Sequence, residues 1–314
     1  MKALRVSLAV GRCVLIAGYA LGVLLTATAL RAQSAQFAAE VPLLDCDGTP
    51  CVEAQIGEGK VVRLGIDTGN VNSVVDTGAA EAAGLKAVGT MPPGAPEGMF
   101  RTQIASLKIG GATLKNLPAL VMGLGAMISQ KQMPSVDGTL AYTAFKDRVV
   151  QLDFAAHKFR ISDEQTGSPT KCEAGCDKIS LLTFGKDGPE IVVAEGFEIN
   201  GKKVSAQVDT MYAGTLLIYT AAIEKLGLSA AAKTTKMRDF PFTDGGVQMK
   251  EATAEKESFH GIALGGAAPL VYFPAEADVH EPDGLFAGTV GLEMFAGAVV
   301  TLDFHGMTIS VMNK

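Results

Sequence analysis

Two parts of the chain repeat each other, and this repeat constrains the fold more than any other feature of the sequence. The segment 138–154, GTLAYTAFKDRVVQLDF, matches 288–304, GTVGLEMFAGAVVTLDF, at 8 of 17 positions without a gap, at an offset of 150 residues. A second matching pair lies upstream at 62–85 and 205–228. Each upstream segment reads as an apolar strand, Asp-Thr, a turn, a second apolar strand and a short Ala-rich helix closed by Gly-Leu. Because both pairs occur in the same order, the sequence predicts a duplicated chain with two halves of one architecture.

The stretches around these blocks are short apolar runs separated by turn residues. Val, Ile, Leu and Thr dominate the runs, and segments with a helical period are few and short. Gly57-Glu58-Gly59 and Asn200-Gly201 each lie between alternating runs just before an Asp-Thr, as hairpin turns do. Gly110-Gly111 and Gly265-Gly266 mark two more turns. We therefore predict an all-β fold with minor short helices.

Residues 1–29 have the layout of a secretory signal peptide. Three basic residues precede an apolar run from Cys13 to Leu25, which ends near Ala27-Thr28-Ala29. The run is shorter than the roughly 20 residues that a spanning helix needs. We expect export to the periplasm or secretion, with no membrane span once the leader is removed.

The remaining chain is long enough for two lobes, each with its own core. We place the N-terminal lobe at 30–162 and the C-terminal lobe at 179–314. The stretch 163–178, DEQTGSPTKCEAGCDK, is polar, contains Gly and Pro, and reads as a linker.

The charge balance excludes two classes of partner. The full chain has 27 Lys+Arg against 33 Asp+Glu and a net charge of −6, which becomes −9 when the leader takes Lys2, Arg5 and Arg12 with it. An acidic chain without a basic stripe is a poor ligand for nucleic acid, and it lacks the basic cluster that binds anionic membranes.

Four cysteines outside the leader form two close pairs, Cys46 with Cys51 and Cys172 with Cys176. In an oxidising compartment we interpret them as local disulfides, although four cysteines allow three connectivities. A zinc site is the alternative, but no histidine lies near either pair and no two have the spacing of a metal motif. The histidines, which we expect at surface or structural positions, are His157, His260, His280 and His305.

The sequence contains three Asp-Thr pairs, and the repeat selects two of them. Asp67 lies 17 residues before Gly84 and Asp209 lies 18 residues before Gly227, whereas Asp76 lies only 8 residues before Gly84. Asp76 also precedes an Ala-rich run, where a helix favours an N-cap residue. We predict that Asp76 is a cap and that Asp67 and Asp209 form the repeated pair.

Two aspartates at the ends of apolar strands, brought together by a twofold relation, form an acidic dyad. Like charges a few Å apart cannot both ionise, so the pair shares one proton. One carboxylate can then take a proton from water while the other donates a hydrogen bond to a peptide carbonyl. This arrangement predicts peptide-bond hydrolysis by an activated water, with no cofactor and no metal.

The chain resembles the pepsin and retropepsin superfamily of aspartic proteases over most of residues 50–312. It is most similar to bacterial retropepsin-like members with both halves in one chain. The resemblance rests on the hairpin, the Asp-Thr turn, the Gly-Leu after a short helix and the later Gly-Thr segment leading to Leu-Asp-Phe, each present twice. It implies a bilobal pepsin-like fold of two β-barrel-like lobes, with a substrate cleft between them and a flap over it. It also implies an endopeptidase that acts on peptide or protein substrates, and we expect a monomer.

The resemblance assigns roles residue by residue. The family's catalytic aspartates correspond to Asp67 and Asp209. Its threonines, which brace the two active-site loops against each other, correspond to Thr68 and Thr210. Its glycine corresponds to Gly69 in the first half alone.

The second half departs from the family pattern after its Asp-Thr. Met211 stands where the family has glycine, and a methionine there would crowd the dyad or shift the loop. The next position, usually a small residue, is Asn70 in one half and Tyr212 in the other. The alternative hypothesis is therefore a non-catalytic peptide- or ligand-binding protein on the same fold. A half-site that completes its dyad by dimerising is a weaker alternative, since one chain holds both turns.

Other features receive structural interpretations. Asp153 and Asp303 end matching strands and are expected to accept hydrogen bonds from turn backbone. Either 90–102 or 236–250 could form the flap, and the sequence does not choose between them. The repeated aromatic residues predicted in the core are Phe145, Phe154, Phe295 and Phe304.

Overall fold

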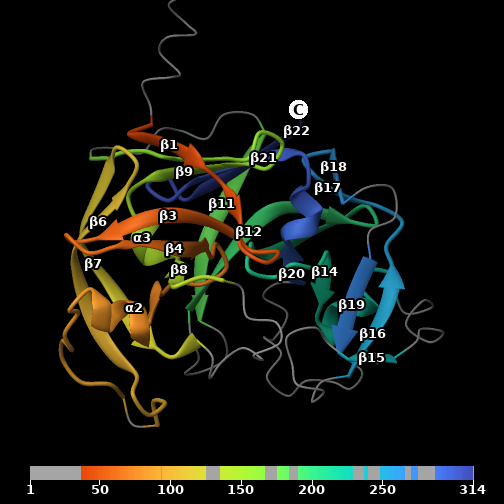
Figure 1. Cartoon of the computed structure of the whole chain (residues 1–314). Helices are drawn as coiled ribbons and strands as arrows, with labels where there is room; N and C mark the ends of the chain where they lie inside the picture. The colour runs from red at the N-terminus through yellow and green to blue at the C-terminus, as the bar shows by residue number, and fades with distance from the viewer. Residues whose placement is uncertain are drawn as a thin grey trace, which may run out of the picture. The chain divides into compact units, whose positions relative to one another are not determined.

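The structure is a computed structural model, and most of the regular secondary structure in its described residues is β-strand (Figure 1). It describes residues 37–92, 94–124, 135–166, 175–183, 190–228, 237–239, 248–265, 270–274 and 287–313. Residues 39–314 form one compact unit, and the predicted leader 1–29 lies outside the described residues. No helix in this described part is long and apolar enough to cross a membrane. The predicted all-β class with short helices is confirmed.

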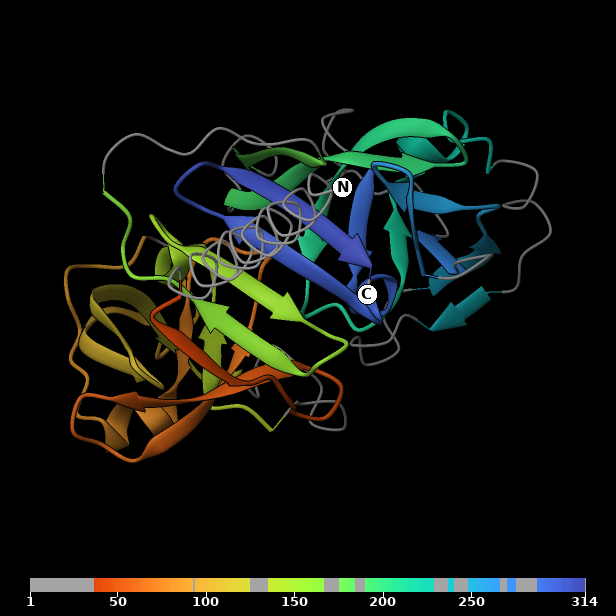
Figure 2. The ribbon, with the colours of Figure 1, turned by 90° about the horizontal axis from the view of Figure 1, so that it is seen from above.

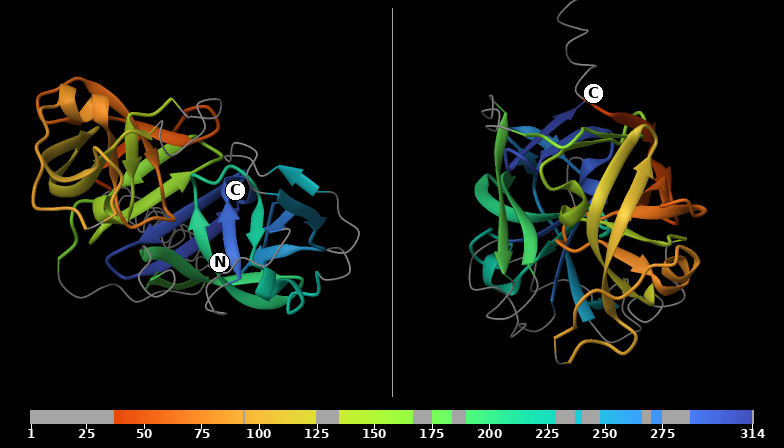
Figure 3. Two further views of the ribbon diagram at one scale, coloured as in Figure 1. Left: turned by 90° about the horizontal axis from the view of Figure 1, so that it is seen from below. Right: turned by 90° about the vertical axis from the view of Figure 1, so that its left-hand side faces the viewer.

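The first half of the chain forms a sheet that curls back on itself. Its strands follow the order β2-β3-β4-β8-β5-β7-β6, and β3 also pairs with β6. That additional pairing gives the sheet its barrel-like form. The long β6–β7 hairpin, gold in Figure 3, turns at Gly110-Gly111 as predicted. The bounds are β2 Leu44–Asp45, β3 Pro50–Ile56, β4 Val61–Ile66, β5 Val74–Asp76, β6 Phe100–Ile109, β7 Ala112–Met122 and β8 Gly138–Leu140.

The second sheet contains strands from both halves. Its order is β1-β10-β9-β21-β22-β11-β12-β13-β20-β14-β19-β16-β15. Strand β17 pairs with β12 outside this order, and β18 pairs with β17. The bounds are β1 Ala39–Pro42, β9 Val149–Asp153, β10 Lys158–Ile161, β11 Cys176–Thr183, β12 Glu190–Ile199, β13 Lys202–Asp209, β14 Leu216–Ile218, β15 Met237–Asp239, β16 Gln248–Thr253, β17 Glu257–Phe259, β18 Ile262–Leu264, β19 Leu270–Pro274, β20 Gly288–Gly291, β21 Ala298–Asp303 and β22 Thr308–Asn313. The predicted linker 163–178 therefore ends inside β11, which pairs with β22 from Cys176 onward. The predicted lobe boundaries remain predictions.

Each half places its Asp-Thr after a strand with the same set of neighbours. In the first half β4 runs parallel to β8, β8 antiparallel to β5, and β5 parallel to β7. In the second half β13, β20, β14 and β19 repeat these relations in the same order. The matching glycines Gly138 and Gly288 allow the crossing strands to approach, because a Cβ at either would collide with the carbonyl oxygen of Val74 or Leu217.

The matching sequence segments also pair with each other. Strands β9 and β21 are antiparallel, and Gln151 faces Thr301, its counterpart at the repeat offset of 150. The two side chains hydrogen-bond at 2.9 Å. Figure 2 shows the yellow-green hairpin β9–β10 beside the blue hairpin β21–β22. Pairing between equivalent residues is the register that a local twofold axis between the two hairpins requires.

The short helices and caps follow the sequence signals. Asp76 is the N-cap of α2 and accepts a hydrogen bond from the Gly78 amide at 2.9 Å. Asp153 accepts from the Ala156 amide at 2.9 Å, and Asp303 from the Gly306 amide at 2.8 Å. These carboxylates therefore serve turns, as predicted. The helices within the described residues are α2 Thr77–Ala82, α3 Tyr142–Phe145, α4 Thr220–Ile223 and the 3₁₀ turn η2 Leu292–Phe295.

The repeated aromatic residues lie in or against the core. Phe145, Phe295 and Phe304 are buried, and half-buried Phe154 stacks on Phe295 with 6.4 Å between ring centroids. The core prediction holds, with Phe154 at its margin.

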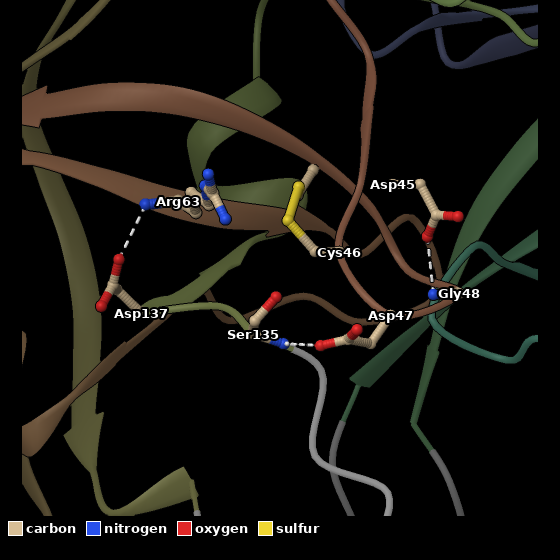
Figure 4. The surroundings of a disulfide bond; sticks show 8 residues. Asp45, Cys46, Asp47, Gly48, Arg63, Ser135 and Asp137 are labelled. Carbon is tan, nitrogen blue, oxygen red and sulfur yellow. Dashed lines mark hydrogen bonds between the residues drawn. A yellow bond between two sulfur atoms is a disulfide. The ribbon is translucent and has the colours of Figure 1, made fainter.

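The disulfide Cys46–Cys51 closes the turn between β2 and β3 (Figure 4). Carboxylates hold the turn on both sides: Asp45 accepts from the Gly48 amide at 2.6 Å and Asp47 from the Ser135 amide at 3.1 Å. This pairing confirms the first predicted disulfide. Cys176 is also disulfide-bonded, and its predicted partner Cys172 lies outside the described residues.

Candidate active site

Asp67 and Asp209 hold equivalent places at the ends of β4 and β13. The Asp67 amide donates to the Leu140 carbonyl of β8 at 2.8 Å. Asp209 pairs with Gly291 of the parallel strand β20. In each half, therefore, a parallel neighbour fixes the backbone at the aspartate.

The two Asp-Thr turns are locked together by a reciprocal network of buried hydrogen bonds. The Thr68 hydroxyl donates to the Val208 carbonyl at 2.7 Å, and the Thr210 hydroxyl donates to the Ile66 carbonyl. The amide of each threonine donates to the hydroxyl of the other at 3.3 Å. Both threonines are buried. The network holds the two turns that carry the aspartates against each other.

Gly69 brings the first turn directly against Asp209. A Cβ on Gly69 would lie 2.8 Å from Cβ of Asp209, 2.9 Å from its Cγ and 2.9 Å from Nε2 of Gln207. Real side chains do not make contacts this close, so only glycine fits the position. The two candidate carboxylates thus belong to one site.

Burial raises the pKa of both carboxyl groups, and the charge of Asp209 raises that of Asp67 further. Asp67 is 6% exposed, and its pKa is raised to about 7, first by burial and then by the charge of Asp209. Hydrogen bonds from Asn70 and Gly69 act in the opposite direction. Burial also raises the pKa of Asp209, against the lowering effect of the Met211 and Tyr212 amides. A pair with these properties can hold a single proton near neutral pH.

The side chain of Met211 lies beside Gly65, and not against the aspartate pair that the sequence suggested it would crowd. Its Sδ lies 3.1 Å from the place a Cβ on Gly65 would occupy, so its side chain fills the space beside that glycine. Its backbone amide donates to Oδ1 of Asp209 at 2.8 Å. The loop therefore keeps its hydrogen bond to the aspartate while the larger side chain is placed against β4.

Tyr212 is packed inside the second half. It is buried, and its ring lies against Gly214 and Gly291, where a Cβ would stand 2.5 Å from Oη or Cδ1 of the tyrosine. Two glycines therefore make room for the residue that replaces the small one expected here.

The second half also holds the backbone of the first turn. The Val192 amide and Nε2 of Gln207 both donate to the Gly69 carbonyl, at 3.1 and 2.9 Å. The Thr289 hydroxyl in turn donates to Oε1 of Gln207 at 3.0 Å. Asn70 forms an antiparallel bridge with Ile191.

The contacts of Gly65 with Met211 and of Gly69 with Gln207 were not predicted from the sequence, although the sequence contains a signal for them. Gly65 and Gln207 are equivalent at the offset of 142, as are Gly69 and Met211. Both glycines lie in the first half, and each faces the large side chain at the other position of the second half. This pattern in the sequence becomes informative only when the contact between the two turns is known.

Further observations concern the expected absence of a metal and the choice of flap. Among the described residues, no group of three or more His, Cys, Asp or Glu side chains could hold a metal ion. The segment 90–102 runs from the loop after α2 into the start of β6, where the Val88 amide donates to the Arg101 carbonyl at 2.8 Å. The tip of the other candidate flap, Phe240 to Gly246, lies outside the described residues. The choice of flap stays open.

Comparison with known proteins agrees with this architecture. Residues 52–143 match a family model described as aspartyl protease, a segment that includes Asp67 and ends before Asp209. The chain is similar to the crystal structure of an aspartic proteinase from Irpex lacteus, with a TM-score of 0.52 and 11% identity. That similarity covers 88% of this chain and 97% of the other, and at this identity it shows the fold. No curated protein sequence matches the chain.

Proposed function

We propose that this chain, which has the fold of an aspartic proteinase and matches the aspartyl protease model over residues 52–143, is a working aspartic endopeptidase of the pepsin- and retropepsin-like superfamily. Asp67 and Asp209 would activate a water molecule that hydrolyses peptide bonds. The observation that carries the proposal is the reciprocal Thr68–Thr210 network, which holds both Asp-Thr turns at one site.

The proposed reaction needs one proton on the pair. The charged carboxylate takes a proton from water as the water oxygen bonds to the peptide carbon, and the protonated carboxyl group gives its proton to the carbonyl oxygen. The resulting diol loses one hydroxyl proton to the pair while the pair protonates the amide nitrogen. The C–N bond then breaks, releasing an acid and an amine, and the pair again holds one proton.

The surroundings of Met211 favour catalysis over the non-catalytic binding alternative. That alternative rested on Met211 and Tyr212, and both side chains have glycine-lined places that they fill without displacing the hydrogen bonds to Asp209. We also propose that residues 1–29 direct the protein to the periplasm or the exterior, where Cys46–Cys51 would be stable.

The test is peptide-library cleavage by the purified protein between pH 3 and 8, beside Asp67→Asn and Asp209→Asn. We expect either substitution to reduce kcat/KM by about 10²–10⁴-fold, as loss of acid–base catalysis does. Because the pKa of Asp67 is raised to about 7, the pair keeps its last proton up to that pH and loses it above. We therefore expect activity to fall above about pH 7.

Asp76→Asn is the matched control, since Asp76 begins the other Asp-Thr-Gly but caps α2 with one oxygen and accepts from the Leu124 amide with the other, at 3.0 Å. Asparagine is an equally good cap and loses only the bond to Leu124, so this variant should retain activity. Cleavage that survives Asp67→Asn would contradict the proposal. If the folded wild-type protein binds library peptides without cutting them, the binding alternative is correct.

A further inference from the structure

The two aspartates of the pair do not have equivalent environments, and the difference is Asn70. Its side-chain Nδ2 donates to Oδ1 of Asp67 at 3.0 Å and to Oδ2 at 2.8 Å. Its backbone amide donates to Oδ1 at 3.2 Å. One residue therefore serves both oxygens of the carboxylate. Donors of this kind stabilise the charged form of a carboxyl group and fix the plane in which it lies.

Asn70 is itself held in place from two directions. Its carbonyl accepts a hydrogen bond from the Tyr142 amide at the start of α3, at 3.2 Å. Its backbone also bridges to Ile191 of β12, a strand of the second half. Because the backbone is fixed by both halves, the side-chain amide reaches Asp67 without further ordering.

The equivalent position in the second half is occupied by a different kind of side chain. Tyr212 corresponds to Asn70 at the offset of 142, and its ring lies over Gly214 and Gly291. Among the described residues, the hydrogen bonds to Asp209 come from the backbone amides of Met211 and Tyr212, at 2.8 and 3.3 Å, and both bond to Oδ1. A side-chain donor to the pair is therefore found on the Asp67 side alone among the residues described.

Asn70 opposes the two influences that neutralise Asp67. Among the described groups, Asp209 is the one whose charge acts on Asp67, and like burial it raises the Asp67 pKa. No lysine, arginine or histidine in the described chain forms an ion pair with either aspartate. The hydrogen bonds that lower this pKa come from Asn70 and Gly69, and that of the Asn70 side chain is the largest.

We propose that Asn70 is a positioning residue that fixes the Asp67 carboxylate and favours its charged form, and thereby sets the pH range in which the pair shares one proton. The inference rests on the proposed function for its consequence in catalysis. The effect on Asp67 itself can be measured in a protein that cuts nothing.

The test compares Asn70→Ala and Asn70→Ser with wild type by two measurements. The first is NMR titration of ¹³C-labelled aspartate carboxyl groups, with Asp67 assigned by its absence in Asp67→Asn. The second is the pH profile of kcat/KM. We expect Asn70→Ala to move the Asp67 midpoint upward by about one pH unit, which is a tenfold change in proton affinity. The alkaline limb of the profile should move with it.

Asn70→Ser keeps one short donor and should restore part of the shift, even if Asn70→Ala folds poorly. The matched control is Asn313→Ala on the exposed end of β22, which should change neither measurement. An Asp67 midpoint that is the same in wild type, Asn70→Ser and Asn70→Ala would overturn the inference, whether or not the protein cleaves peptides. A shifted midpoint in a protein without cleavage would support the role of Asn70 and reject the proposed function.

Discussion

At the scale of single residues, the site depends on two glycines of the first half that leave space for large side chains of the second half. Gly65 lacks a side chain where Met211 needs space, and Gly69 lacks one where Gln207 needs it. A methionine in place of the family's glycine therefore does not imply loss of function, because the residue it would strike is itself a glycine.

The contact between Met211 and Gly65 predicts the effect of adding a side chain at position 65. Gly65→Val adds atoms where Sδ of Met211 lies, so Met211 must move and shift the loop that donates to Asp209. We expect kcat/KM to fall about tenfold or more and stability to fall by about 1–3 kcal/mol, as overpacking does. Peptide cleavage assays and thermal unfolding would measure both.

The double variant Gly65→Val/Met211→Gly is the control, since it moves the volume to the other half. A coupling energy of about 0.5–3 kcal/mol is expected between the two changes if they act through one contact. Additive effects would show that Met211 and Gly65 do not share that space.

At the scale of elements, the two halves differ most clearly at β17. Glu257 pairs with Ile199 of β12 and Leu264 of β18, and Leu107 stands at the matching place between β3 and β7. Glu257 is 1% exposed, and neither carboxylate oxygen has a hydrogen-bond partner in the described structure. Burial raises its pKa well above the usual value. A carboxyl group whose neutral form is favoured by burial thus stands where the first half has a leucine.

Glu257 should make the stability of the protein depend on pH. A carboxyl group whose pKa rises on folding binds protons more tightly when folded. The stabilisation that comes from this tighter proton binding is therefore fully present below the unfolded pKa of about 4.3, and it is lost as the pH rises toward the folded pKa. Each pH unit in that range costs about 1.4 kcal/mol. Glu257→Leu should abolish this loss, so its Tm should exceed that of wild type by more at pH 7 than at pH 4.

Thermal unfolding of both proteins from pH 4 to 8 provides the measurement. Glu257→Gln keeps the size of the side chain and serves as the comparison, because it removes the titration while leaving a buried polar group. A Tm difference between wild type and Glu257→Leu that is constant over this range would contradict the prediction.

At the scale of the whole molecule, two contacts join the halves about one local axis. One is the β9–β21 pairing through Gln151 and Thr301, and the other is the network of Thr68 and Thr210. Both join residues that are equivalent in the repeat. The hydrogen bonds of the threonines are buried, so removing one hydroxyl leaves its partner carbonyl without a donor.

Thr210→Val should therefore lower both stability and activity. The Ile66 carbonyl would lose its donor, and the two amide–hydroxyl bonds would be reduced to one. We expect a loss of about 1–3 kcal/mol in unfolding free energy, the cost of a buried unsatisfied group, together with a decrease in kcat. Thr210→Ser keeps the hydroxyl and should behave nearly as wild type in denaturant unfolding and cleavage. Equal unfolding free energies for valine and serine variants would be inconsistent with the network.

The sequence by itself determined the parts of this protein that depend on local pattern and on repetition. The alternating apolar runs predicted strands, the glycine pairs predicted hairpins, and Asp76 was predicted as a cap from its place before an Ala-rich run. The repeat offset separated Asp67 and Asp209 from that third Asp-Thr. Each of these predictions depends only on a few neighbouring residues or on the direct comparison of two segments of the sequence.

The tertiary structure alone decided what lies across the axis between the halves. The sequence could not show that Met211 fits beside Gly65 or that Tyr212 packs on Gly214 and Gly291. Nor could it show that the Asn70 side chain donates to both carboxylate oxygens of Asp67. Each depends on contact between segments that are brought together by strand pairing or by loop geometry. Whether a large side chain is tolerated depends on the free volume opposite it, and one chain position carries no record of that volume.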